Sequence, residues 1–173
     1  MSYKIGTLNL CLGLPNKKDD VKIIILEENL DILFMQETEI QQNSDINSLS
    51  FGGFNIEIEN TDYKARVAAY IKNGVDYVRR ADLEGKSMHI IVIDLPGAIN
   101  YRIINVYRSF SPPVNMSQRQ YFLNQLATIK MAMCERCVVL GDFNLDWSRF
   151  SDSRYAFKNY MFTLCCTTTL KSG

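Results

Sequence analysis

The feature that most constrains the fold of this chain is an apolar strand that runs directly into a short polar turn. Residues 138–140 are Val-Val-Leu, and they are followed by Gly141, Asp142, Phe143 and Asn144. A hydrophobic strand that ends in a carboxylate and a carboxamide places polar groups at a sheet edge, where ligands usually bind. The turn therefore predicts a functional site at the end of a buried strand.

Three earlier apolar runs also end in polar residues. In chain order they deliver Asn9, then Glu37, then the neighbours Tyr107 and Arg108. The run before Glu37 is continuously apolar, as in a strand that is covered on both faces. Four runs with such ends predict that their polar side chains meet in one assembled site.

Length and charge narrow the class of protein. The 173 residues are enough for one buried core, so we expect a single domain over 1–173. Lys plus Arg equal Asp plus Glu at 19 each, so no global field steers the chain toward nucleic acid. A local basic groove is still enough for DNA binding.

Other features favour an intracellular protein outside the membrane. No apolar run approaches the roughly 20 residues of a membrane span, and the first residues lack the pattern of a signal peptide. Five cysteines without a framework spacing fit a reducing compartment. Cys134 and Cys137 have no second Cys or His pair nearby, which argues against a zinc or redox site there.

The hydrophobic pattern predicts helices and strands at both ends and a β-rich middle, hence an α/β (α+β) layered sandwich. The predicted helices are 17–30, 117–133 (with Ser117 and Gln120 as a capping box) and 152–164. The predicted strands are 3–11, 31–36, 54–59, 65–72, 75–80, 88–94, 101–107 and 137–141, with a polar loop over 41–50.

The residue types at the strand ends suit phosphodiester hydrolysis. Glu37 is a hard oxygen ligand for Mg²⁺, and Asp142 can take a proton from water or orient it for attack. Asn144 and Tyr107 can donate to phosphate oxygens, where charge builds up in the transition state. Arg108 can contact a phosphate bidentately.

The same residues carry a resemblance. Asn9, Gln36-Glu37-Thr38, Asn105-Val106-Tyr107-Arg108 and Gly141-Asp142-Phe143-Asn144 occur in the order and approximate spacing of the endonuclease/exonuclease/phosphatase superfamily. Over residues 3 to about 160 the chain most resembles the apurinic-type endonuclease domain of non-LTR (LINE-type) retrotransposons. The segments at Arg66–Ile71 and Trp147 are similar to that group as well.

The resemblance implies a two-sheet β-sandwich flanked by helices, and a Mg²⁺- (or Mn²⁺-) dependent DNA endonuclease. Such an enzyme nicks the target site of a retrotransposon and leaves a 3′-hydroxyl that primes reverse transcription. It implies Asn9 and Glu37 at the metal, and Tyr107, Asp142 and Asn144 as catalytic residues around the scissile phosphate. DNA is the implied partner.

The chain also departs from the family pattern. The family's closing Ser-Asp-His motif is missing, and the only histidine, His89, lies in an apolar run that predicts a mid-sheet position. Cys11 stands where many relatives carry Asp. We therefore expect a C-terminally truncated domain with impaired nicking, and an exposed sheet edge that favours a homo-oligomer.

Several alternatives stay open. The chain can be a phosphatase or exonuclease of the same superfamily, or a non-catalytic relic that binds nucleic acid or itself. Asp142 and Asn144 can merely shape an Asx turn, Asn9 can be an ordinary strand-end residue, and Tyr107 can be packing. Trp147 can stack on a base or lie in the core. A further set can form a DNA-facing patch or a solvated sheet face: Lys64, Arg66, Lys72, Arg79 and Arg80.

Overall fold

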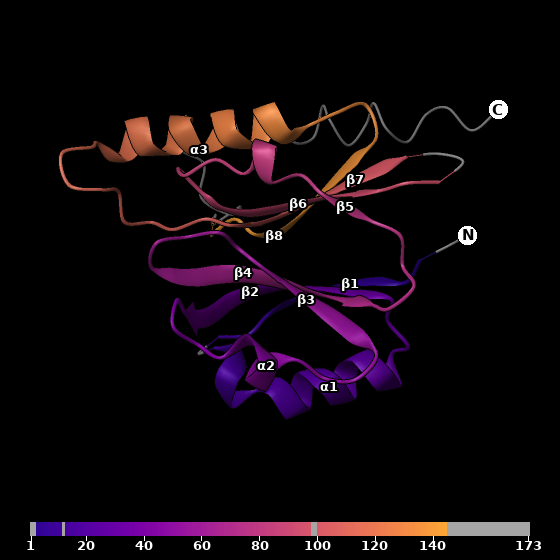
Figure 1. The fold of residues 1–173 in the computed structure, drawn as a ribbon. Helices are drawn as coiled ribbons and strands as arrows, with labels where there is room; N and C mark the ends of the chain where they lie inside the picture. Colours follow the sequence, from indigo (N-terminus) through magenta and orange to yellow (C-terminus); the bar gives the residue numbers. More distant parts are fainter. Residues whose placement is uncertain (1–2, 12, 98–99, 145–173) are drawn as a thin grey trace.

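The computed structural model describes residues 3–11, 13–97 and 100–144 and shows two sheets stacked face to face, with helices on their outer faces (Figure 1). The first sheet has the strand order β1-β2-β4-β3 and the second the order β5-β6-β7-β8. The strands of the first sheet are β1 (Ile5–Asn9), β2 (Ile32–Gln41), β3 (Phe54–Ile58) and β4 (Lys64–Lys72). Those of the second are β5 (Val78–Arg79), β6 (His89–Leu95), β7 (Tyr101–Tyr107) and β8 (Cys137–Asp142).

Each sheet contains one parallel pair, and the two parallel pairs position the polar strand ends. Strands β1 and β2 run parallel, as do β7 and β8, whereas the other neighbouring strands are antiparallel. Parallel neighbours end at the same edge of a sheet. The ends of β1 and β2 therefore lie together in one sheet, and the ends of β7 and β8 in the other.

The helices complete a four-layer arrangement. Helix α1 (Lys18–Glu27) and the single turn α2 (Ile46–Leu49) cover the first sheet, and α3 (Gln118–Ala132) covers the second (Figure 1). Two 3-10 turns, η1 (Leu14–Asn16) and η2 (Ala81–Leu83), lie in connections. An apolar cluster fills the space between the sheets, and its buried members are Ile32, Phe34, Val67, Ala69, Ile71, Ile91, Ile93, Leu95 and Ile103.

This architecture confirms the predicted two-sheet sandwich, with three local differences. Strand β2 continues to Gln41, well beyond the predicted 31–36. The predicted loop over 41–50 contains α2, because Asp45 caps the N–H of Asn47 at 2.9 Å and Leu49 is buried. Strand β5 is shorter than the predicted 75–80. The predicted helix 152–164 and Trp147 lie outside the described residues.

Helix α3 begins as predicted, but with half of the expected cap. The Ser117 hydroxyl accepts the N–H of Gln120 at 3.2 Å. The Gln120 side chain donates to Asn124 at 2.9 Å, so the reciprocal bond of a capping box is not among those made. The buried face of α3, which includes Phe122 and Ile129, packs on the second sheet.

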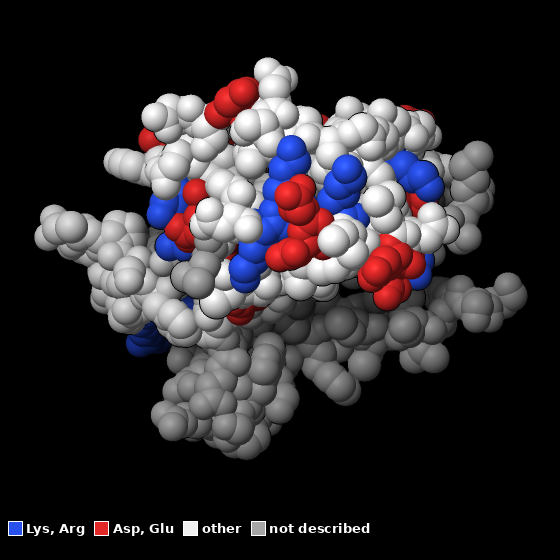
Figure 2. Space-filling view, turned by 90° about the horizontal axis from the view of Figure 1, so that it is seen from below, with Lys and Arg blue, Asp and Glu red and all other residues white. Residues whose placement is uncertain are grey.

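The helical face of the first sheet carries mixed charges. Figure 2 shows this face from below the view of Figure 1, with acidic and basic side chains interspersed. Helix α1 itself contains Lys18, Asp19, Asp20 and Lys22. No single-sign surface of the kind that attracts nucleic acid therefore covers this helix. In the part of the chain that the structure describes, no helix is long and apolar enough to cross a membrane.

Candidate active site

The side chain of Asn9, at the end of β1, connects carboxylates from both sheets. Its Nδ2 donates to Glu37 Oε1 at 3.1 Å and to Asp142 Oδ2 at 2.8 Å. Its Oδ1 accepts the N–H of Cys11 at 2.9 Å, which fixes the orientation of the amide. The structure thus brings together Asn9, Glu37 and Asp142, which were predicted to meet.

Glu37 reaches this position through an irregularity in β2. The pairing of β2 with β4 shifts register between Gln36 and Ile40, and both Glu37 (φ 54°) and Glu39 (φ 52°) have left-handed backbones. In a regular strand, Glu37 would point to the face opposite that of Gln36, toward the helices. The bulge turns its carboxylate toward Asn9 instead, and bulges commonly re-aim a side chain next to an active site.

The buried Thr38 hydroxyl holds the bulge in place by donating to the carbonyl of Ala65 at 2.8 Å. Each left-handed non-glycine residue costs on the order of 1–3 kcal/mol and persists only where its surroundings fix it. The bulge in β2 contains two such residues, so the fold maintains it at an energetic cost.

The turn after β8 is equally constrained. Gly141 has φ 122°, and a Cβ there would overlap the Val106 carbonyl oxygen and lie 2.8 Å from the Val106 nitrogen. Asp142 Oδ1 accepts the N–H of Asn144 at 2.8 Å, so the residues do form an Asx turn. The other oxygen, Oδ2, bonds to Asn9. One carboxylate therefore shapes the turn and also faces the site.

Arg108 holds this turn from behind. Its side chain is only 8% exposed overall, and its Nε donates to Gln125 Oε1 at 3.1 Å while Nη1 donates to the Asn144 carbonyl at 3.1 Å. Asn144 Nδ2 in turn donates to the Arg108 carbonyl at 2.8 Å. The sequence predicted that Arg108 contacts substrate phosphate, but this burial and bonding favour a positioning role.

Tyr107 lies next to Asp142 in the second sheet. The strand register pairs Tyr107 with Asp142 on one side and with His89 on the other. The guanidinium of Arg66 lies 5.4 Å from the centre of the Tyr107 ring, and the His89 ring lies 5.8 Å away. Tyr107 is half-buried, so it is both a packing residue and part of the site edge.

The predicted mid-sheet position of His89 is wrong. His89 is the first residue of β6, and its Nδ1 lies 2.9 Å from Glu59 Oε1. Most of the apolar run lies after His89 along β6, and only Met88 precedes it, so the run as a whole resembles a strand interior. His89 therefore lies at the same sheet edge as Tyr107.

Sequence reasoning missed a polar connection between the sheets. Gln36 and Asn105 are 2% and 0% exposed, and Gln36 Nε2 donates to Asn105 Oδ1 at 2.6 Å. Gln36 also donates to the Thr7 hydroxyl at 3.0 Å, and Asn105 donates to the Met35 carbonyl at 3.2 Å. The available signal was one amide inside each of two apolar runs, because a buried amide needs a partner.

The two site carboxylates differ from their neighbour Glu39 in their pairing. Glu39 makes ion pairs with Lys64, at 2.5 Å, and with Arg66. Neither Glu37 nor Asp142 has an ion pair with any residue of the described ranges. The site therefore holds two negative groups that an amide, and not a cation, holds together.

This donor set fits a magnesium ion. Mg²⁺ is usually held by one or two carboxylates and completes its shell with water and substrate phosphate. Glu37 and Asp142 are hard oxygen donors, whereas the Asn9 Oδ1 accepts the N–H of Cys11 and faces away from the two carboxylates. Among the described residues, no group of three or more His, Cys, Asp or Glu side chains could hold a metal ion, so the site offers two carboxylates.

The predicted basic patch is internally neutralised. Arg79 pairs with Glu57 and Glu84, and Arg80 pairs with Asp82 and Asp94. Lys72 lies 3.3 Å from Asp31. Together with the pairs of Glu39, these contacts support a solvated sheet face over a DNA-facing surface.

Comparisons with known proteins identify the family and the fold. Residues 6–163 match the model of the "Endonuclease/Exonuclease/phosphatase family". The endonuclease domain of TRAS1, a telomere-specific non-LTR retrotransposon, is similar in structure, with a TM-score of 0.69 and 15% identity over 94% of this chain and 71% of that one. An AP endonuclease from Archaeoglobus fulgidus gives 0.67 and 19%, with the same coverage of both chains.

A third similar structure is the 3′ phosphatase NExo from Neisseria bound to a product DNA hairpin, with a TM-score of 0.64 and 20% identity over 94% of this chain and 71% of that one. A search of curated proteins found no significant match. At these identities the structural neighbours establish the fold, and the family model establishes the membership. The chain belongs to the endonuclease/exonuclease/phosphatase family.

Proposed function

We propose that residues 1–173 form one domain that hydrolyses DNA phosphodiesters with Mg²⁺ or Mn²⁺, as the target-site endonuclease of a retrotransposon. The observation that carries the proposal is the Asn9 amide, which bonds at once to two carboxylates from facing sheets, Glu37 and Asp142. The pair lies at the strand ends and has no cation of its own among the described residues. A divalent cation would supply the missing positive charge.

In this proposal each residue has a distinct task. Glu37 holds the metal, which when bound polarises the phosphate and offsets its charge. Asn9 orients the Glu37 carboxylate at the metal through its Nδ2. Asp142 accepts a proton from the attacking water or orients that water for in-line attack. Asn144 and Tyr107 donate hydrogen bonds to the phosphate oxygens. Arg108 fixes the Asp142–Asn144 turn and does not contact substrate.

DNA as the substrate is supported by two of the neighbours. One is the endonuclease domain of a non-LTR retrotransposon, and another is a 3′ phosphatase bound to a product DNA hairpin. The free thiols Cys11, Cys134 and Cys137 fit the intracellular location that we propose with it.

We further propose that nicking by this 173-residue chain is weak. Its single histidine bonds to Glu59 and is separated from Asp142 by the intervening strand β7. Cys11, close to Asn9, offers no carboxylate. The described residues therefore place neither a histidine next to Asp142 nor a carboxylate at position 11. Loss of one residue from a cooperating catalytic group typically lowers the rate by orders of magnitude.

A supercoiled-plasmid assay with Mg²⁺ tests the proposal. Glu37→Ala and Asp142→Ala remove one carboxylate each, and Asp94→Asn is the matched control because Asp94 lies at the opposite edge. We expect slow nicking that both alanine variants abolish and the control retains. Nicking that persists in Glu37→Ala would contradict the assigned site, and fast nicking by the unmodified chain would contradict the proposed impairment.

Two other functions remain testable. The Neisseria 3′ phosphatase matches this fold almost as well as the endonucleases do, so release of phosphate from a 3′-phosphorylated oligonucleotide, without nicking, would favour a phosphatase. A self-associating, non-catalytic role is favoured by β8, the outermost described strand of its sheet, where Val138 is 48% exposed. A concentration-dependent dimer in size-exclusion chromatography, without nicking, would favour that role.

A further inference from the structure

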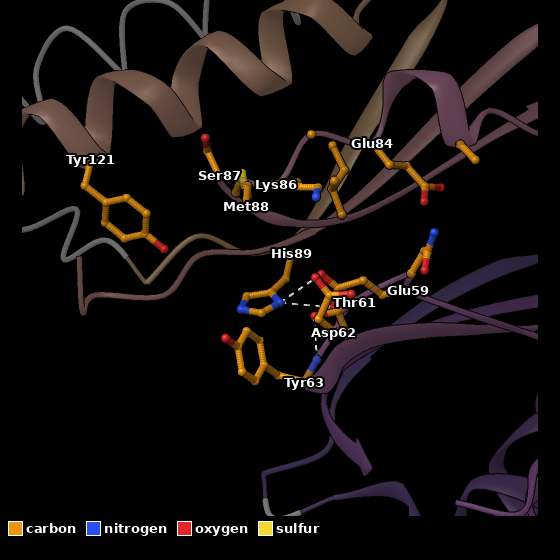
Figure 3. Close-up of a pocket in the computed structure, with 14 residues that line it drawn as sticks. Glu59, Thr61, Asp62, Tyr63, Glu84, Lys86, Ser87, Met88, His89 and Tyr121 are labelled. Atoms are coloured by element: carbon orange, nitrogen blue, oxygen red, sulfur yellow. Dashed lines mark hydrogen bonds and ion pairs between the residues drawn. The ribbon is translucent and has the colours of Figure 1, made fainter. Parts of the chain in front are cut away.

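A cavity near the candidate site takes no part in the proposed hydrolysis. It has a volume of about 310 Å³ and lies between the connection of β3 to β4, the start of β6 and helix α3 (Figure 3). The residues that define its character are Glu59, Asp62, Tyr63, His89 and Tyr121. This volume lies at the lower end of the range for small-ligand pockets.

Tyr107 lies between the cavity and the site in the second sheet. His89 lines the cavity and is paired in register with Tyr107, which is paired with Asp142. Neighbouring strands lie about 4.8 Å apart, so the backbone of His89 is roughly 10 Å from that of Asp142 along one row of the sheet. A strand of nucleic acid with its phosphate at Asp142 would therefore bring a nearby nucleotide to the cavity.

His89 is held firmly at the cavity wall. Its Nδ1 lies 2.9 Å from Glu59 Oε1 and 3.0 Å from Oε2. Glu59 Oε2 also accepts the N–H of Arg66 at 3.0 Å, and the Glu59 side chain is 9% exposed. In Figure 3 the other ring nitrogen of His89 points away from Glu59, toward the opening. The Glu59 carboxylate thus fixes the imidazole and leaves its outer edge facing the cavity.

The opening is lined by aromatic rings. Figure 3 shows the rings of Tyr63 and His89 at the mouth, and the Tyr121 hydroxyl directed toward the same opening. Tyr63 is 81% exposed, so most of its apolar ring is in contact with water. An exposed ring beside a cavity suits a stacked nucleobase, because every base presents a π face.

The charge of the lining decides between a base and a phosphate. Glu59 is bonded to His89 and Glu84 is paired with Arg79, so the exposed Asp62 is the carboxylate that can accept from a ligand. Lys86 also lines the cavity, so the lining contains three carboxylates and one lysine. Carboxylates accept hydrogen bonds from exocyclic amino groups, such as N4 of cytosine. Thymine presents a carbonyl and a methyl group at the same edge. The lining therefore favours a base that carries an amino group.

We propose that this cavity binds an unpaired, amino-bearing nucleobase of the strand that is to be cut, stacked on Tyr63 and bonded to the acidic lining. The location of that base relative to the scissile phosphate rests on the proposed function, whereas its binding does not. Single-stranded or locally opened DNA is then the favoured substrate class, because a base within a duplex is stacked and paired.

The test measures binding without catalysis. Fluorescein-labelled dC8 and dT8 are titrated with the full 173-residue chain in EDTA, so that no divalent metal permits cleavage, and anisotropy gives each Kd. These two pyrimidine probes differ at the edge that the lining would read. We expect dC8 to bind at least roughly threefold more tightly than dT8, the ratio that one weak hydrogen bond gives.

Three variants locate the effect. Tyr63→Ala removes the ring and should weaken binding of both probes roughly fivefold to tenfold. Asp62→Asn, at an exposed position, should reduce the preference for dC8 without that loss. Tyr101→Ala is the matched control, since Tyr101 is a half-exposed tyrosine (48%) at the opposite end of β7.

The outcomes separate this proposal from the proposed function. Equal binding of dC8 and dT8, or binding that Tyr63→Ala leaves unchanged, would overturn the base site even if the plasmid is nicked. An equal loss in Tyr101→Ala would overturn it as well. A dC8 preference that depends on Tyr63, in a chain that never nicks a plasmid, would keep the base site and reject the nuclease.

Discussion

The two edges of the sandwich treat carboxylates in opposite ways. At the edge formed by the start of β2 and the end of β6, Asp31 and Asp94 are bonded to cationic residues. Asp31 accepts the backbone N–H of Lys4 at 2.9 Å and lies 3.3 Å from the Lys72 ammonium. Asp94 accepts from the Arg102 guanidinium at 2.6 Å and pairs with Arg80. At the site edge, the carboxylates of Glu37 and Asp142 have an amide between them.

The pKa values follow the pairing at the first edge. The backbone N–H of Lys4 lowers the pKa of Asp31, and the hydrogen bonds from Arg102 lower the pKa of Asp94. These carboxylates stabilise the fold as they are. At the site edge, Glu37 and Asp142 lie close together without a cationic partner among the described residues. In our proposal a bound divalent cation neutralises this negative charge.

The two edges also differ in how many backbone residues have left-handed φ angles. Within the described ranges, four of the six non-glycine residues with positive φ are Cys11, Glu37, Glu39 and Asn144, all at the site edge. The other edge has one such residue, Asn29 (φ 47°), in the turn from α1 to β2. Local strain that the rest of the fold stabilises is a common property of functional sites, and the following predictions test this difference.

The largest effect should come from Gly141→Ala. The new Cβ would meet the Val106 backbone, which cannot move aside as a side chain would, and φ 122° would be strained. We expect a loss of about 3 kcal/mol or more in the free energy of unfolding, measured by urea denaturation. Gly52→Ala is the control, because its Cβ would meet nothing within 4 Å. A similar small change in both would mean that the site edge is not strained.

Asn105→Ala should rank second. It leaves the buried Gln36 without its 2.6 Å partner between the sheets. An unsatisfied buried amide costs about 1–3 kcal/mol, to be measured by the same denaturation. Asn55→Ala, on the exposed side of β3, should change stability by less than about 0.5 kcal/mol. Equal losses in the two variants would show that the buried bridge contributes nothing specific.

Asn9→Asp probes the charge at the site directly. It replaces the amide donor with a third carboxylate next to Glu37 and Asp142. We expect the metal-free protein to lose roughly 1–2 kcal/mol, because two charge-assisted hydrogen bonds become repulsions. Mg²⁺ should restore part of the loss, as a rise in Tm that the unmodified chain shows less strongly. A variant as stable as the original without metal would contradict the proposed clustering of charge.

Asp94→Asn gives the smallest effect and depends on pH. Because the folded-state pKa of Asp94 lies below 3.8, its contribution is present above about pH 3.8 and is lost as pH falls through the lowered value. We expect a loss of about 1 kcal/mol at pH 7 that disappears as the pH falls below 3.8 through the lowered pKa, measured by thermal unfolding from neutral to acidic pH. A loss that is independent of pH would point to packing and not to the ion pairs.

The sequence predicts where the strands end, but it does not predict the bulge in β2. The apolar runs before Asn9, Tyr107 and Asp142 are local patterns, and strand ends and parallel pairing bring those residues to one edge. The bulge at Glu37 depends on the pairing of β2 with β4, which residues 31–36 do not reveal. Their apolar pattern also stops before the polar end of β2.

Long-range partners explain the other differences. Arg108 is buried because Gln125 and the Asn144 carbonyl lie within reach, and both are distant in sequence. His89 meets Glu59 across 30 residues and across the two sheets. No local pattern predicts such a pair. The residue types indicated the chemistry, and the packing shows which of them lie together at the strand ends.

The most direct test of the central claim is a calorimetric titration of the chain with Mn²⁺ in the absence of nucleic acid. If the site edge holds two carboxylates for a cation, the unmodified chain and Asp94→Asn should bind one Mn²⁺ alike. Glu37→Gln, which keeps the shape of the side chain, should bind at least roughly tenfold more weakly. Equal binding by Glu37→Gln, or no binding by the unmodified chain, would contradict the account.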